Sequence, residues 1–337
     1  MRLLILGGTI FLGRHLAGQA LESGAQVTLF TRGQHNPELF PQARKLRGDR
    51  DADLRALGEG EWDAVIDTCG YLPRIVRKSA RLLAKRVAHY TFISSVSAYA
   101  PSREARIDES APLASLPAGA GEEVNAQTYG PLKVLCERAV EAELPGRALI
   151  VRPGLIVGPY DRSDRFTYWP RRIAGGGEIL APGRPDRRVQ LIDVRDLSAW
   201  ILQMVAQRRT GAFNAAGPDK PLTMRRVLHT CREACDSRGR FVWVADEFLR
   251  GQGVAPYTEL PLWIPGEDDR VDCRKAVRAG LTFRSLRTTI WETFAWDLSR
   301  PLGMELCAGL SAEREIALLR AWRAQCPDGA GVEQEEQ

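Results

Sequence analysis

The sequence lacks several features that would define other classes of protein. No apolar run approaches the roughly 20 residues that span a bilayer, so no membrane segment is expected. The seven cysteines are odd in number and scattered, a pattern that does not form a disulfide or zinc framework. The four histidines are equally scattered, and we expect no metal site. The net charge of +5 over 337 residues argues against a nucleic-acid partner.

The first residues predict no export signal. The apolar residues after Arg2 end at Gly7 and Gly8, and no small-residue cleavage site follows. Together with the unpaired cysteines, this favours a soluble protein of the reducing cytoplasm. Hydrophobic residues make up 44% and charged residues 26% of the chain, as in ordinary globular proteins. The length suggests two domains, or one large domain with a lobe.

Strands and helices alternate through the first half of the chain. Short apolar runs predict strands at 3–6, 26–31, 43–47, 64–67, 89–94 and 148–151. Helical spacing of apolar residues predicts helices at 13–23, 75–86 and 129–143. This alternation indicates an α/β fold, a Rossmann-like doubly wound parallel sheet with helices on both faces.

The regular alternation weakens after about residue 155. Short strands are predicted at 189–192 and 212–214, and helices at 224–236, 286–298 and 312–324. We therefore expect a dinucleotide-binding domain at 1–155, a smaller mixed α/β substrate-binding lobe at 156–326 with elements returning to the core, and a disordered tail at 327–337. The aromatic and arginine-rich segment 161–172 has two interpretations, the lining of a pocket or a loop over the surface.

A glycine-rich turn lies between the first predicted strand and the first predicted helix. Gly7, Gly8 and Gly13 permit a tight turn and let backbone N–H groups approach a pyrophosphate. Because the turn opens an alternating fold, it predicts dinucleotide binding. The alternative is a plain turn.

The end of the second predicted strand bears on the choice of cofactor. An NAD site usually places a carboxylate here, to hold the 2′-hydroxyl of the ribose. Thr31 and Arg32 offer none, and Arg32 could pair with a 2′-phosphate, which favours NADP over NAD. The alternative is a solvated arginine. Asp49, after the third strand, could accept a hydrogen bond from the adenine amino group.

Tyr129 and Lys133 are four residues apart and share one face of a predicted helix. A nearby ammonium favours a phenolate, so the pair could move a proton at a carbonyl or carbinol oxygen. Ser95 lies at the carboxyl end of a predicted strand, where ligands bind in open parallel sheets, and could contact the same oxygen. The alternatives are a chance spacing and a strand end capped by serines.

Four motifs in this order resemble a known family. They are Gly7-Gly8-Thr9-x-Phe11-Leu12-Gly13, Ser94-Ser95-x-Ser97-x-Tyr99, Tyr129-x-x-x-Lys133 and Arg152-Pro153-Gly154-x-x-x-Gly158-Pro159. The set is similar to the extended short-chain dehydrogenase/reductase superfamily, and more narrowly to its bacterial NAD-dependent epimerase/dehydratase proteins.

The resemblance implies a catalytic mechanism. Tyr129 would be the general acid/base, Lys133 would hold the nicotinamide ribose and lower the pKa of Tyr129, and Ser95 would polarise the substrate carbonyl. A homodimer through 75–86 and 129–143 is also implied. The expected cofactor-binding residues are Gly7, Gly8, Thr9, Phe11, Leu12, Gly13, Thr31, Arg32, Asp49, Thr68, Cys69, Gly70, Ser94, Tyr129, Lys133, Pro153 and Gly154.

The sequence departs from the family at several positions. Ile10 occupies the place of the middle glycine of the phosphate loop. Val96 and Ser97 stand where the sugar 4,6-dehydratases carry Asp-Glu, which disfavours that dehydration. Leu155 replaces an asparagine that helps nucleotide-sugar epimerases hold the diphosphate. The candidate substrate residues are Val96, Ser97, Leu155 and Arg188.

Three functions follow as hypotheses. The first is an NAD(P)-dependent oxidoreductase acting on a carbonyl or secondary alcohol of a small molecule. The second is a nucleotide-sugar epimerase with tightly held NAD. The third is a relative without catalysis that senses NADP or binds RNA.

Overall fold

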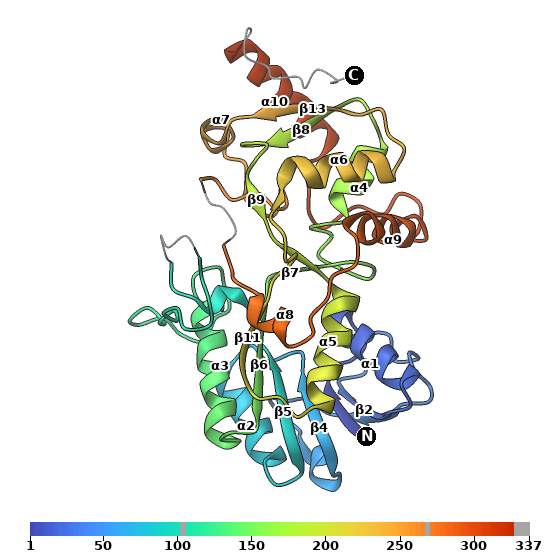
Figure 1. Ribbon diagram of the computed structural model, residues 1–337, viewed down its shortest axis with the longest axis vertical. Coiled ribbons are helices and arrows are strands. Elements are labelled where there is room, and N and C mark those ends of the chain that lie inside the picture. The colour runs from blue at the N-terminus through green and yellow to red at the C-terminus, as the bar shows by residue number, and fades with distance from the viewer. Residues whose placement is uncertain (102–105, 267–269, 327–337) are drawn as a thin grey trace. The chain divides into compact units, whose positions relative to one another are not determined.

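The computed structural model describes residues 1–101, 106–266 and 270–326, and the chain divides into two compact units (Figure 1). Unit 1 contains Met1–Ile156, Val194–Asp219 and Arg270–Phe283, and unit 2 contains Val157–Asp193, Lys220–Asp269 and Arg284–Gln337. The expected domain boundary at residue 155 stays a prediction, because compactness alone does not define a part that folds independently. The expected disordered tail lies outside the described residues.

The described part of unit 1 is built on a seven-stranded sheet in the order β11-β6-β5-β4-β1-β2-β3. Every neighbouring pair is parallel, so the predicted fold class is confirmed. The order reverses between β1 and β4, and ligands bind at such a reversal, beyond the carboxyl ends of the strands. The strands are β1 (Arg2–Leu6), β2 (Gln26–Thr31), β3 (Arg44–Arg47), β4 (Trp62–Asp67), β5 (Val87–Ile93), β6 (Ala148–Pro153) and β11 (Gly211–Ala215).

Helices cover both faces of this sheet (Figure 1). On one face, α2 (Pro73–Leu83) packs against α3 (Tyr129–Glu143), and on the other, α1 (Phe11–Glu22) packs against α5 (Val194–Ala206). The helix α2 begins earlier than predicted because a proline is well tolerated in the first turn. The shorter elements are η1 (Arg55–Glu59), η2 (Val96–Ala98), β7 (Leu155–Val157) and α8 (Arg274–Arg278).

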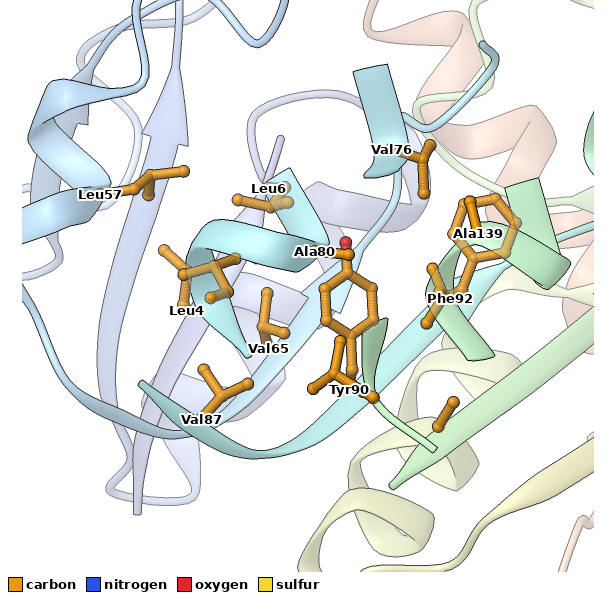
Figure 2. Packing of buried hydrophobic residues seen from close by; sticks show 14 of the residues in the cluster. Leu4, Leu6, Leu57, Val65, Val76, Ala80, Val87, Tyr90, Phe92 and Ala139 are labelled. Carbon is orange, nitrogen blue, oxygen red and sulfur yellow. The ribbon is translucent and has the colours of Figure 1, made fainter. Parts of the chain in front are cut away.

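Apolar side chains of the sheet meet those of α2 and α3 in a continuous core (Figure 2). Leu4, Val65 and Phe92 from the strands pack with Val76 and Ala139 from the helices. The central strands are buried on both faces, which explains why they are short apolar runs rather than alternating ones. Each large buried side chain contributes about 1.5–3 kcal/mol, so this core fixes the strand ends that carry the site.

Unit 2 is assembled from short elements. Strands β8 (Glu178–Pro182) and β13 (Arg240–Val244) pair in parallel, and β9 (Arg188–Val189) pairs antiparallel with β12 (Leu222–Thr223). The strand predicted at 189–192 is divided between β9 and β10 (Leu191–Asp193). The helices are α4 (Tyr168–Ala174), α6 (Met224–Ala234), α7 (Asp246–Gly251), α9 (Leu286–Leu298) and α10 (Ala312–Gln325).

The interpretation of segment 161–172 as a loop over the surface is wrong, and its lining of a pocket stays a prediction. Phe166, Tyr168 and Trp169 are buried, and the indole Nε1 of Trp169 donates to the carbonyl oxygen of Pro261 at 3.0 Å. These aromatic rings form the core of unit 2, because large rings bury more apolar area than any other side chain. Among the described residues, none of the helices combines the length and apolar character that crossing a bilayer requires.

Candidate functional site

The glycine-rich turn has a backbone geometry that would suit a phosphate group. Gly7 and Gly8 have φ angles of 105° and 101°, which side-chain-bearing residues rarely adopt. A Cβ added to Gly13 would lie 2.7 Å from the backbone nitrogen of Gly8, so α1 can approach the turn only with a glycine there. No side chain caps the first turn of α1, which leaves its N–H groups for an anionic ligand.

Ile10 does not obstruct this loop. Its backbone is extended, with φ −129° and ψ 137°, a conformation that suits a β-branched residue. Its side chain is exposed rather than packed into the turn. The departure from the usual glycine spacing is therefore compatible with a phosphate loop.

The end of β4 lies against this loop, at the reversal of strand order. The backbone N–H and hydroxyl of Thr68 both donate to the carbonyl oxygen of Leu6, at 3.2 and 2.9 Å. A Cβ on Gly7 would lie 2.5 Å from the Thr68 hydroxyl oxygen. Burial raises the pKa of the Cys69 thiol, which keeps it protonated at neutral pH. Thr68 and Cys69 thus border the glycine-rich turn.

A buried ion pair that sequence reasoning missed supports this strand end. The guanidinium of Arg50 donates to both carboxylate oxygens of Asp67, at 2.6 and 2.7 Å. Asp67 also accepts from the hydroxyl of Tyr90 at 2.9 Å and from the backbone N–H of Cys69 at 3.2 Å. The pair therefore fixes the turn that leads to Gly70.

The loop after β2 is tied to the phosphate loop. The side-chain amide of Asn36 donates to the carbonyl oxygen of Thr9 at 2.8 Å, a contact with no sequence signal. The hydroxyl of Thr31 accepts from the N–H of Gly33 at 3.2 Å. Arg32 is exposed between them, and Asp49 uses one carboxylate oxygen to accept from the N–H of Asp51 at 2.9 Å.

The three candidate catalytic residues come from two neighbouring elements. Ser95 caps η2, where its hydroxyl accepts from the N–H of Ser97 and donates to the Ser97 hydroxyl, both at 3.1 Å. A Cβ on Gly130 would lie 1.9 Å from the Ser97 carbonyl oxygen, so α3 starts directly against this turn. The close approach brings Tyr129, the first residue of α3, beside the turn that begins at Ser95.

Lys133 lies one helical turn further, in a cage of carbonyl groups and aromatic rings. Its Nζ donates to the carbonyl oxygens of Gly70 and Ile93, at 2.8 and 2.9 Å. The same atom is 4.8 Å from the ring centre of Tyr71 and 5.8 Å from that of Tyr129. The side chain is only 3% exposed, and burial lowers the pKa of Lys133 to about 8.

Tyr71 is a further site residue that sequence reasoning missed. Its ring centre is 6.5 Å from that of Tyr129, and the residue is 49% exposed. An ammonium is attracted to the face of such a ring. Tyr71 therefore helps to hold the charge of Lys133 and leaves part of its own ring open beside Tyr129.

A buried polar network underlies the catalytic residues. Glu137, on the same face of α3 as Lys133, accepts twice from Arg152, at 3.0 and 2.6 Å, and once from the hydroxyl of Ser94. Arg152 donates to the phenol oxygen of Tyr99 at 3.0 Å, and that phenol donates to Asn214 at 2.6 Å. The sequence signal for Glu137 was its position four residues after Lys133, which places both residues on one face of the helix. The hydroxyl of Ser94 is therefore part of this buried hydrogen-bond network.

The other predicted residues take various places. Thr9 and Leu12 are buried in the phosphate loop, and Phe11 has a positive φ of 35° at the start of α1. The N–H of Gly154, after Pro153, donates to the carbonyl oxygen of Ala215 at 3.3 Å. Of the substrate candidates, Leu155 is buried, Val96 is half-buried, Ser97 is exposed, and Arg188 lies on β9 of unit 2. No cluster of potential metal ligands occurs in the part of the chain that the structure describes.

The fold and this geometry define an α/β protein with a Rossmann-like, doubly wound parallel sheet. The reversal of strand order coincides with a glycine-rich phosphate loop, and a serine, a tyrosine and a lysine lie along the neighbouring strand end and helix. Residues 3–216 match the NAD dependent epimerase/dehydratase family. The chain belongs to this family, as its motifs predicted.

Individual relatives are distant. The chain is 25% identical over 256 residues to the "Chloroplast stem-loop binding protein of 41 kDa b, chloroplastic" of Arabidopsis thaliana, a match that covers 69% of this chain and 63% of the relative. It thus spans less than two thirds of that relative's length.

Solved structures share the fold at low identity. UDP-glucuronic acid 4-epimerase from Bacillus cereus, in complex with NAD, is 14% identical with a TM-score of 0.66, over 89% of this chain and 99% of that one. WbmG from Bordetella bronchiseptica, in complex with NAD and UDP, is 18% identical with a TM-score of 0.67, over 89% and 95% of the two chains.

Proposed function

We propose that the protein is an NAD(P)-dependent oxidoreductase that interconverts a carbonyl and a secondary alcohol on a small molecule. The observation that supports the proposal is the close approach of α3 to η2 at Gly130, because it brings the start of the helix that carries Tyr129 and Lys133 against the turn that Ser95 caps. Family membership supports the use of a nicotinamide cofactor.

Each of the three side chains has a part in the reduction. When bound, the nicotinamide supplies a hydride to the carbonyl carbon. Tyr129 gives its phenolic proton to the carbonyl oxygen, which Ser95 holds by a hydrogen bond. Lys133 has given two N–H groups to carbonyl oxygens, and its remaining donor can bind the ribose. In the reverse direction Tyr129 accepts the proton of the alcohol.

The residues present fit a dinucleotide. The phosphate loop and the uncapped start of α1 would hold the pyrophosphate, and Thr68, Cys69 and Gly70 would border the nicotinamide half. The lack of a carboxylate at Thr31-Arg32 supports NADP as the preferred cofactor, and NAD is the alternative.

The test is turnover of NADPH and NADH with a panel of aldehydes and ketones. The substitution Tyr129→Phe removes only the proton donor, so we expect kcat to fall about 100-fold or more. Cofactor affinity, measured on the same variant, is expected to change little and serves as the control for folding. Unchanged turnover in Tyr129→Phe would refute the catalytic role.

A nucleotide-sugar epimerase is the second candidate, since solved relatives of the same fold carry that name. Its expected signs are NAD(H) that copurifies with the protein and isomerisation of a UDP-sugar without net oxidation. The apolar Leu155 disfavours it. If UDP-sugars fail to raise the melting temperature, this candidate is excluded.

Binding to RNA is a third candidate, favoured by the name of the Arabidopsis relative. On α2, Arg74, Arg77, Lys78 and Arg81 are exposed at helical spacing, although Arg74 and Arg81 pair with carboxylates. A gel shift of a labelled RNA stem-loop that weakens steeply with salt would support it.

A further inference from the structure

Two arginines lie at the carboxyl ends of neighbouring strands, because Arg32 directly follows β2 and Arg47 ends β3. Arg47, the last residue of β3, is in register with Thr31, the last residue of β2. A Cβ added to Gly33 would lie 3.0 Å from the Nε and 3.3 Å from the Cζ of Arg47. The guanidinium of Arg47 therefore lies against the residue that follows Arg32.

Neither arginine is paired within the described residues 1–101, 106–266 and 270–326. Both side chains are exposed, and no ion pair or hydrogen bond reaches either guanidinium. Nearby arginines differ, because Arg50, Arg55 and Arg74 each pair with an aspartate. Two exposed cations without partners at neighbouring strand ends would favour an anion that reaches both.

The position of this pair along the sheet indicates which anion. The N–H of Gly48, directly after Arg47, donates to the carbonyl oxygen of Thr31 at 3.1 Å. Asn36 joins the loop after Arg32 to the phosphate loop through Thr9. In this fold the end of β2 is where the adenosine ribose of a bound dinucleotide lies.

We propose that Arg32 and Arg47 together bind a phosphate monoester on the ribose, and that Arg47 is a determinant of NADP specificity. The inference rests on the proposed cofactor preference and adds a second strand to the site. A guanidinium matches phosphate oxygens with two parallel N–H donors, and two of them can neutralise a dianion. NAD, which has a hydroxyl in that place, gives neither arginine a partner.

The experiment measures the affinity of NADP, NAD and 2′,5′-ADP for the full chain by calorimetry. The variants are Arg47→Gln and Arg32→Gln. We expect each to weaken NADP and 2′,5′-ADP about 10-fold or more, and to change NAD less than about 2-fold, because only the 2′-phosphate contact is lost.

The matched control is Arg44→Gln. This substitution removes the same charge from the same strand. Arg44 is three residues before Arg47, so its side chain lies on the opposite face of the pleated strand. We expect unchanged NADP affinity.

The outcomes separate the two proposals. If Arg32→Gln weakens NADP and Arg47→Gln does not, the role of Arg47 is overturned and the NADP preference stands. If the unaltered protein binds NAD at least as tightly as NADP, the preference itself is overturned. Equal weakening of NADP and NAD by Arg47→Gln would indicate a structural effect and would also overturn the inference.

Discussion

At the scale of single residues, Lys133 shows how the protein stabilises one buried charge. Water is excluded from the ammonium, which is why its pKa falls to about 8. Two carbonyl oxygens and the rings of Tyr71, Phe92 and Tyr129 replace the lost hydration in part. The site thus has a lysine whose charge changes near neutral pH.

The stability of the protein is expected to report this titration. In the unfolded chain Lys133 titrates near its ordinary pKa of about 10.4. Between about pH 8 and pH 10 the unfolded chain therefore binds more protons, and this residue makes the free energy of unfolding rise with pH. We predict that Lys133→Met loses about 2 kcal/mol relative to the unaltered protein as pH rises from 7 to 9.5.

The measurement is urea unfolding of both proteins across this range. Buried thiols such as Cys136, with a pKa of about 12, act in the opposite direction, because they ionise only in the unfolded chain. Their contribution is the same in both proteins and cancels in the difference. A difference that stays constant with pH would contradict the burial of the ammonium.

The spacing of Tyr129 and Lys133 was readable from the sequence, because a helix places residues four apart on one face. The contacts of Lys133 with the carbonyl oxygen of Gly70 and the ring of Tyr71 could not be predicted from the sequence. Gly70 and Tyr71 lie about 60 positions earlier in the chain, and only the pairing of β4 with β5 brings them to α3. Local patterns contain no information about such long-range contacts.

At the scale of elements, α3 is anchored by two ion pairs of very different burial. Glu137 and Arg152 are both about 95% buried at their side chains. Glu143, near the end of the same helix, pairs with Arg81, which is 71% exposed. The two pairs allow the effect of burial to be measured on one helix.

We predict that Glu137→Gln destabilises the protein by about 3–5 kcal/mol, since it leaves Arg152 as a buried charge without its partner. Glu143→Gln is expected to cost less than about 1 kcal/mol, because exposed pairs contribute little. Denaturant unfolding of both variants provides the comparison. Similar losses in the two variants would show that the Glu137 pair does not anchor α3.

The strands and long helices of unit 1 could be predicted because propensity and burial agree there. Segment 161–172 could not be, since its arginines suggest a surface and its rings suggest a core. The structure resolves the conflict by pairing Arg171 with Asp297 and Arg172 with Glu315. Their partners lie more than 120 residues later, beyond the reach of local patterns.

At the scale of the whole molecule, the two units differ in their aromatic content. Six of the eight tryptophans lie in unit 2, and only Trp62 and Trp200 lie in unit 1. The proposed cofactor site belongs to unit 1. Tryptophan fluorescence therefore reports mainly on unit 2, which does not contain the proposed cofactor site.

We predict that NADP at 100 times its dissociation constant stabilises unit 1 by about 2.7 kcal/mol, or about 5–10 °C in the melting temperature. Scanning calorimetry with and without NADP measures the shift. If the units unfold separately, the fluorescence midpoint is expected to move less than the calorimetric transition of unit 1. No shift at saturating NADP would contradict cofactor binding.

The sheet of unit 1 is completed by a strand from much later in the chain. Strand β11 pairs with β6, although all of the elements from β7 to α5 lie between them in sequence. During synthesis β6 leaves the ribosome long before its neighbour, and its backbone groups form an open edge on which other chains can pair. The sheet of unit 1 can therefore be completed only after translation has passed residue 215.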